Sequence, residues 1–244
     1  MTNEDFLHTL ESGARRAAYK KDSRWIVDSD VKARILDIIK SSPVINMSDG
    51  FCDKEILKPR KFYVSNSVRM VPGGSSVRSG AHIASGVIIM PPSFINIGAY
   101  VDASTMIDSH VLVGSCAQIG KHVHLSAGVQ IGGVLEPVGA QPVIIEDNCF
   151  IGAGVIITEG ILVQEGAVLA PGVCLSAGVP IYDIINKNII KGIVPKNAVV
   201  ISGTRPVSNN SWAQEQGLNM GCALIIKYRD DKTSTALMLE SALR

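Results

Sequence analysis

Three histidines lie close together in the middle of this sequence, at His110, His122 and His124. A histidine side chain has an ordinary pKa near 6.5, which suits a general base that removes a proton at neutral pH. Three imidazoles are also a known ligand set for catalytic zinc. The sequence leaves three interpretations open: a base, for which His110 and His122 are the candidates, a zinc site, or surface and hydrogen-bonded turn histidines without a chemical role.

Charged side chains flank these histidines. Asp108 follows the aliphatic Ile107, Glu136 lies in the segment GGVLEP, and Arg69 lies in VRMVP. A carboxylate near an amine can accept its proton, and an arginine can bind a substrate carboxylate through two parallel hydrogen bonds. Considered alone, Asp108 is better read as a solvated turn residue, and Arg69 and Glu136 as ordinary surface charges.

The composition excludes several classes of function. Lys and Arg number 23 against 22 Asp and Glu, and the only basic run is the short KPRK at 58–61, so nucleic acid is not expected as a partner. Five cysteines without CxxC spacing argue against a disulfide framework and a cysteine zinc site, and favour a reducing cytoplasm. The acidic, polar first residues and interrupted aliphatic runs predict neither a signal peptide nor a membrane span.

An aliphatic residue returns at every sixth position through much of the chain. The residue three places later is often Gly or Asn, which tolerate a positive φ at a turn, and the residue four places later is small or β-branched. The first series is Val77, Ile83, Ile89, Ile95, Val101, Ile107, Val113, Ile119, Leu125 and Ile131, and the second is Ile145, Ile151, Ile157, Val163, Leu169, Leu175 and Ile181.

A period of six fits neither a helix nor a simple alternating strand. It fits a short strand and a turn repeated three times per coil, with one aliphatic side chain per side pointing into a triangular prism. Residues 77–130 then form three coils and residues 145–180 two more. A narrow interior also explains why only five Phe, five Tyr and two Trp occur in 244 residues. The predicted fold is mainly β, a parallel β-helix whose hand the periodicity alone does not determine.

Breaks in this period divide the chain. Loops are predicted to leave the prism near 132–144 and 182–193, and insertions of this kind commonly carry binding sites in repeat proteins. Residues 1–65 are predicted to form a small helical domain, with a helix over 30–40, and residues 66–205 the β-helix. Residues 206–244 are predicted to form a cap, with a loop over 208–217, a strand over 222–228 and a terminal helix over 233–243.

The repeat and one motif block together resemble a known family. The stretch NIGAYVDASTMIDSHVLVGSCAQIGKHVHLSAGVQIGGVLEP, followed by IIEDNCFIGA, is similar to the tetrahydrodipicolinate N-succinyltransferase family of hexapeptide-repeat acyltransferases, with the match spanning about 68–203. The resemblance implies a left-handed β-helix and a homotrimer with active sites between neighbouring prisms. It also implies transfer of succinyl from succinyl-CoA, as co-substrate, to the amino group of L-2-amino-6-oxopimelate, with no bound cofactor and no metal.

Residue roles follow from the same resemblance. Asp108 matches the family's essential aspartate, which orients the amine or accepts its proton, and Arg69 matches an arginine that binds a substrate carboxylate. Glu136 could reach into a neighbour's site. One position departs from the pattern: after CFIGA the family is expected to read Arg-Ser-Glu, and here Ile156 replaces the glutamate. Either a nearby acid such as Glu159 compensates, or the reaction is slower or different.

Coenzyme A requires cations for its phosphates and a smooth path for its pantetheine arm. Lys191, Lys196 and Arg205 are the candidate cations, while the small outward residues Ala170 and Ser176 would let the arm lie along the prism.

Three alternatives to the succinyltransferase remain. They are an acyltransferase for another acyl-CoA or amine, a zinc hydratase on a prism of the carbonic anhydrase kind, and a catalytically silent scaffold. Glycine-rich strings such as IGAGV lack the following helix of a dinucleotide or P-loop site.

Overall fold

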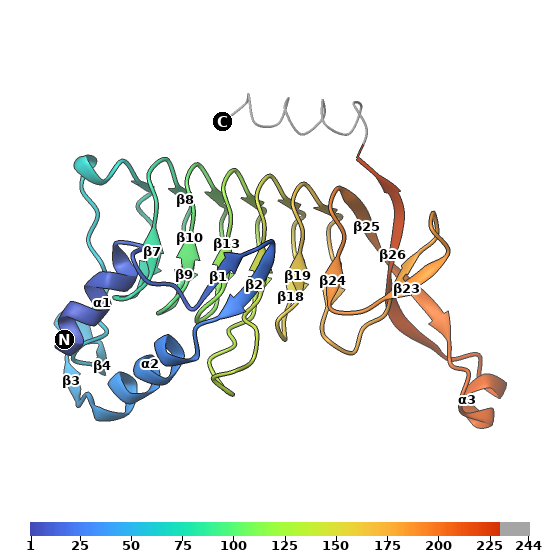
Figure 1. Cartoon of the computed structure of the whole chain (residues 1–244), viewed down its shortest axis with the longest axis horizontal. Coiled ribbons are helices and arrows are strands. Elements are labelled where there is room, and N and C mark those ends of the chain that lie inside the picture. The colour runs from blue at the N-terminus through green and yellow to red at the C-terminus, as the bar shows by residue number, and fades with distance from the viewer. Residues whose placement is uncertain (230–244) are drawn as a thin grey trace.

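The computed structural model describes residues 1–229, and most of them form a prism of three parallel sheets (Figure 1). The chain visits the sheets in turn, and each strand pairs with the strand one coil away; Tyr100, for example, is opposite Gln118. This arrangement of two-residue strands is that of the left-handed β-helix, so the predicted mainly-β fold is confirmed. No helix within residues 1–229 combines the length and apolar character needed to cross a bilayer.

Three sheets form the sides of the prism. Sheet 1 contains β7 (His82–Ile83), β10 (Tyr100–Val101), β13 (Gln118–Ile119), β16 (Ile144–Ile145), β19 (Leu162–Val163) and β24 (Ile193–Val194). Sheet 2 contains β5 (Arg69–Met70), β8 (Ile88–Ile89), β11 (Met106–Ile107), β14 (His124–Leu125), β17 (Phe150–Ile151), β20 (Val168–Leu169), β25 (Ala198–Pro206), β26 (Asn219–Tyr228), β22 (Ile181–Asp183) and β23 (Asn188–Ile190). Sheet 3 contains β6 (Ser76–Val77), β9 (Phe94–Ile95), β12 (Leu112–Val113), β15 (Gln130–Ile131), β18 (Ile156–Ile157) and β21 (Cys174–Leu175).

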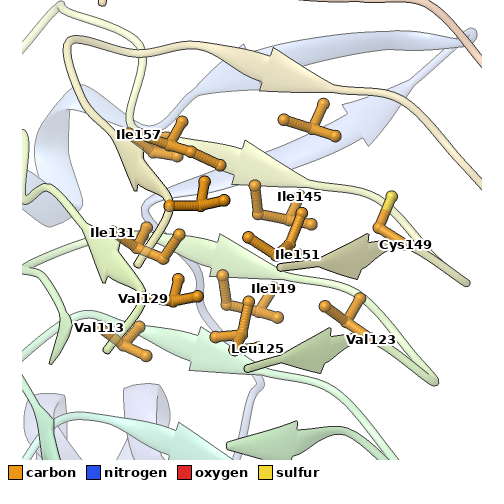
Figure 2. Packing of buried hydrophobic residues seen from close by; sticks show 14 of the residues in the cluster. Val113, Ile119, Val123, Leu125, Val129, Ile131, Ile145, Cys149, Ile151 and Ile157 are labelled. Atoms are coloured by element: carbon orange, nitrogen blue, oxygen red, sulfur yellow. The ribbon is translucent and has the colours of Figure 1, made fainter. Parts of the chain in front are cut away.

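The interior of the prism is filled by the aliphatic residues of the six-residue period (Figure 2). Every member of both series is buried; Ile83, at 8% exposed, is the most accessible of them. Corners between the sheets use a left-handed backbone, as at Gly98 (φ 74°) and, without glycine, at His110 (φ 63°) and His122 (φ 53°). The pattern of the sequence therefore specified both the sides and the corners of the prism.

The N-terminal residues pack against the outer face of sheet 1 (Figure 1). Their elements are α1 (Asn3–Glu11), β1 (Ala18–Lys21), β2 (Arg24–Val27), α2 (Ser29–Ser41), β3 (Val44–Asn46), β4 (Cys52–Lys54) and two 3-10 turns (Ser48–Gly50 and Val64–Asn66). The predicted helix over 30–40 corresponds to α2, which buries Val31, Ile35 and Ile38. Two antiparallel hairpins, β1–β2 and β3–β4, accompany the predicted helical character.

The long loop between β15 and β16 is fastened to the N-terminal residues. Lys32 of α2 is fully buried, and its Nζ donates a hydrogen bond of 2.6 Å to the carbonyl oxygen of Ala140 in this loop. Burial lowers the pKa of Lys32 because the charged ammonium loses its hydration there. Leu135 of the same loop packs against the N-terminal hydrophobic cluster, so the loop lies toward α2.

The C-terminal part of the described chain extends sheet 2 beyond the prism. β25 pairs with β20 at Val199 and then continues as a long antiparallel pair with β26, which contains the strand predicted over 222–228. The prediction of a loop over 208–217 is wrong in part, because α3 (Ser211–Glu215) forms there, capped by the Asn210 side chain, which accepts a hydrogen bond from the Ala213 amide (2.9 Å). The helix predicted over 233–243 lies outside the described residues.

Glu146 attaches the β1–β2 hairpin to the prism. Its carboxylate accepts hydrogen bonds from Lys20 Nζ (2.7 Å), Trp25 Nε1 (2.9 Å) and the Glu165 amide (3.1 Å). Burial alone would raise the pKa of Glu146, but these three donors outweigh it and hold the pKa below its ordinary value.

Replacing Glu146 with glutamine is expected to lower the free energy of unfolding at pH 7 by about 1–3 kcal/mol, a range reduced for partial exposure of the site. The lowered pKa means that this stabilisation exists above the carboxyl's unfolded pKa and is lost as the pH falls through its folded pKa. Urea unfolding of the wild type and E146Q should therefore differ at pH 7 and converge in acid. E4Q, at an exposed position, is the control, and a pH-independent difference would contradict the assignment.

Candidate active site

Asp108 lies at the corner where the chain passes from sheet 2 to sheet 3. Its backbone amide continues the parallel ladder by donating to the Leu125 carbonyl (2.9 Å), and its Oδ1 accepts a hydrogen bond from the Ser109 amide (2.8 Å). The side chain is half-buried, and within residues 1–229 its Oδ2 has no hydrogen-bond partner. One carboxylate oxygen thus fixes the orientation of the side chain and the other can bind an incoming group.

Ser93 holds this corner in shape from the coil below. The side chain is buried, and its Oγ donates to the Asp108 carbonyl oxygen (2.8 Å) while accepting a hydrogen bond from the Val111 amide (3.2 Å). It thereby joins both ends of the turn that carries Asp108. Ser93 was not identified from the sequence. The coil length predicts that position 93 lies beside position 111, so Ser93 could have been recognised as a neighbour of this turn.

His110 shares the corner of Asp108, whereas His122 does not. His110 is exposed two residues beyond Asp108, and His122 is exposed at the corner between sheets 1 and 2. His124 lies on the outer face of sheet 2, opposite Met106. Its ring packs edge-on against the Phe150 ring, with 4.8 Å between the ring centroids. Of the two histidines considered as bases, only His110 is placed near the candidate aspartate.

One coil above Asp108, Ser126 occupies the equivalent corner position, and its Oγ lies 3.4 Å from His124 Nε2. This pair was also missed, because His124 was considered only for zinc. The three histidines occupy different corners and faces, and within residues 1–229 no three His, Cys, Asp or Glu side chains gather in a way that could hold a metal ion. The described part of a single chain therefore provides no ligand set for the zinc alternative.

Arg69 lies on the same sheet as the strand that precedes Asp108. It is exposed in β5, and β8 separates β5 from β11, so the two strands are about 10 Å apart at the usual spacing. Glu136 is exposed in the loop that leaves the corner between sheets 3 and 1. Within one chain the structure places Arg69 and Asp108 on neighbouring surfaces and does not bring Glu136 to them.

The residues considered for coenzyme A are distributed over several surfaces. Ala170 lies on the same corner as Asp108, three coils further along, or about 14 Å. Ser176 belongs to the corner between sheets 3 and 1. Of these two residues, Ala170 alone lies in line with Asp108 along the prism.

The candidate cations are further apart. Lys196, at the corner between sheets 1 and 2, pairs with Glu165 (Nζ to Oε2, 2.8 Å), and this hydrogen bond raises the pKa of Lys196. Lys191 is exposed directly after β23. Arg205 is about 17 Å along β25 from Val200, where that strand leaves the prism. Its Nε is buried and has no hydrogen-bond partner among residues 1–229.

Ile156 points outward from sheet 3 and is 40% exposed. Glu159, the acid nearest to it in sequence, lies at the corner between sheets 3 and 1, where its Oε2 accepts a hydrogen bond from the Ala177 amide (2.9 Å). The Glu159 carboxylate is therefore engaged at a corner and does not occupy the face where Ile156 lies.

Comparison with known proteins places this geometry in context. Residues 142–177 match the family described as the hexapeptide repeat of succinyl-transferase. Three proteins named 2,3,4,5-tetrahydropyridine-2,6-dicarboxylate N-succinyltransferase are similar along nearly the whole chain. The one from Wigglesworthia glossinidia brevipalpis is 46% identical over 97% of this chain and 86% of its own. The one from Methylococcus capsulatus is 46% identical over 98% and 88%, and the one from Buchnera aphidicola 44% over 96% and 85%. The similarity thus extends well beyond the predicted span of 68–203.

Proposed function

Because the chain belongs to the 2,3,4,5-tetrahydropyridine-2,6-dicarboxylate N-succinyltransferase family, it is an acyltransferase that succinylates tetrahydrodipicolinate in the diaminopimelate and lysine pathway, and we propose that Asp108 is its catalytic carboxylate. The observation that supports this role is that the two carboxylate oxygens of Asp108 differ in their hydrogen bonding. Oδ1 is bound to the Ser109 amide and Oδ2 has no partner among residues 1–229. An oriented carboxylate of this kind can hold an amine and accept its proton.

The reaction then needs few groups. The amino nitrogen of L-2-amino-6-oxopimelate attacks the thioester carbonyl of succinyl-CoA, a C–N bond forms, and the C–S bond breaks to release the thiol of coenzyme A. Asp108 takes the proton that the amine loses, and the proton passes to the departing sulfur. Arg69 binds a carboxylate of the acceptor through two parallel hydrogen bonds, which places the amine beside Asp108.

Coenzyme A is proposed to follow the corner from Asp108 toward Ala170, a path lined by small residues. Ser176, Lys196 and Arg205 are the remaining proposed contacts, with the two cations assigned to the phosphates. Their separation on a single prism is consistent with a site completed by a second subunit. We propose a homotrimer, in which Glu136 of one chain reaches the Asp108 corner of the next.

A thiol-release assay tests the reaction and its acyl donor. With L-2-aminopimelate as a stable acceptor, succinyl-CoA is expected to be consumed in preference to acetyl-CoA. The exchange of the expected glutamate for Ile156 is the one observation that favours the alternative of another acyl-CoA or amine. Consumption of acetyl-CoA alone would establish that alternative and overturn the succinyl assignment, while the acyltransferase class would stand.

A subunit-mixing experiment tests the shared site. D108N and E136Q should each be weakly active alone, and a mixed trimer should regain activity where an intact Asp108 faces an intact Glu136 across an interface. In a ring of head-to-tail contacts, equal mixing places the two intact residues together in about a quarter of the sites. Recovery to that level supports the proposal, and no recovery in proven mixed trimers contradicts it.

A further inference from the structure

A pocket lies between the β1–β2 hairpin and the corner of sheets 1 and 2, at a different corner from Asp108. Its volume is about 250 Å³. Drug-sized ligands occupy pockets of roughly 300–1,000 Å³, so this one suits a small molecule. The charged residues that line it are Arg16, Lys20, Asp102, Lys121, Glu146, Asp147 and Glu165.

Arg16 is held by a hydrogen bond and by a close ring contact. Its Nε donates to Gln118 Oε1 (3.0 Å), and its guanidinium carbon lies 3.5 Å from the centre of the Tyr100 ring. The Gln118 side chain is itself fixed, because its Nε2 donates to the Cys116 carbonyl (2.8 Å). Within residues 1–229 Arg16 has no carboxylate within ion-pair distance, and burial lowers its pKa. A rigid guanidinium therefore presents its terminal N–H groups to the pocket without an anion of its own.

Two carboxylates complement this cation, on coils that are separated by the coil carrying Lys121. Asp102 Oδ1 accepts a hydrogen bond from the Ala103 amide, and Asp147 Oδ1 accepts one from the Lys121 amide, each at 2.8 Å. Neither carboxylate has an ion-pair partner in the described chain, although the negative charges of both raise the pKa of Arg16 against the larger, opposite effect of burial. Each retains an oxygen for another donor.

The other charges around the pocket already balance one another. Lys20 pairs with Glu146 at 2.7 Å, and Lys196 pairs with Glu165 at 2.8 Å. The unpaired groups are thus one fixed cation, two carboxylates and the exposed Lys121. Opposite charges that face the same small space without touching are suited to a molecule that carries both complementary charges.

We propose that this pocket binds a small zwitterion of the α-amino acid class, with its carboxylate on Arg16 and its ammonium on Asp102 and Asp147. An anion without an amine would meet the two carboxylates, and an amine without a carboxylate would meet Arg16. The site is independent of the acyl transfer described above, because it lies at another corner and uses other residues.

Titration calorimetry on the full chain tests the proposal, with glycine, L-alanine and L-lysine as probes and with acetate and methylamine as their single-charge counterparts. At least one amino acid is expected to bind, and acetate and methylamine are not. R16Q and D147N should weaken that binding roughly tenfold to a hundredfold, as expected for one lost charge-assisted contact. No binding of any amino acid at millimolar concentration, or equal binding of acetate, would overturn it.

Matched variants separate the pocket from the rest of the molecule. R24Q changes an exposed arginine of the same hairpin and should bind as the wild type does. D108N should also bind normally; if it abolishes binding, the amino acid occupies the transfer site and the proposal is wrong. D102N preserves the size of the side chain and an acceptor for the Ala103 amide, so it tests the pocket even if R16Q does not fold. Unchanged binding by a folded D102N and a folded D147N would count against the ammonium position.

Discussion

Replacing Asp108 with asparagine is expected to lower kcat/KM for succinyl transfer by about 100-fold to 10,000-fold, the usual contribution of a general base. Asparagine can still accept the hydrogen bond from the Ser109 amide, so the corner should keep its shape. It cannot take a proton from the amine, because an amide oxygen is far less basic than a carboxylate. Steady-state thiol release, together with the Tm and molar mass of the variant, measures the effect.

A purely structural role for Asp108 makes a different prediction. Asn96 caps the amide of Ile97 (2.9 Å) at another corner of the prism, much as Asp108 caps Ser109. N96A and D108A each remove such a hydrogen bond, and N96A also removes a longer one from Arg78 (3.5 Å). N96A should therefore lower Tm at least as much as D108A, but only D108A should lose activity. If D108N retains wild-type turnover, proton acceptance moves to another group, and His110 at the same corner becomes the candidate to test.

Leu125→Ala is expected to lower the free energy of unfolding by about 2–5 kcal/mol, the range for removing a large buried aliphatic side chain. Leu125 is fully buried, and Figure 2 shows it among the side chains that fill the prism. The cavity cannot collapse easily, because β14 is hydrogen-bonded on both sides, to β11 and to β17. Chemical denaturation at equilibrium provides the measurement.

The control for this substitution is Leu162→Ala, which removes the same atoms from the outer face of sheet 1. Its effect should be clearly smaller, since a side chain that is already partly hydrated leaves no sealed cavity. Equal losses for the two variants would mean that the six-residue period does not distinguish inside from outside. That outcome would contradict the packing described here.

The prism was predictable because its rule is local. A single coil fixes which residue faces inward and which turns the corner, so Ile107 and Val113 could be placed without knowledge of any distant contact. The β1–β2 hairpin was not predicted, because what holds it is remote in sequence: Lys20 and Trp25 bind Glu146, more than a hundred positions away. A short polar segment carries no periodic signal of such a partner.

The candidate site was predictable in part for the same reason. Asp108 emerged from a motif, but Ser93 and Ser126 emerge only when positions one coil apart are placed side by side. The pocket around Arg16 has no linear signature, since it joins the hairpin to two corners from different coils. The sequence repeat predicts which residues are neighbours within the prism. It does not predict which distant segments pack on the outer surface of the prism.

The contact between Lys32 and Ala140 also sets an order of events during synthesis. The two residues are 108 positions apart, so α2 leaves the ribosome long before the loop that will accept its buried ammonium. Until the coils that carry this loop have formed, the lysine lacks its acceptor and the apolar face of α2 lacks part of its cover. The N-terminal residues are synthesised first, but they can complete their packing only after the prism has folded.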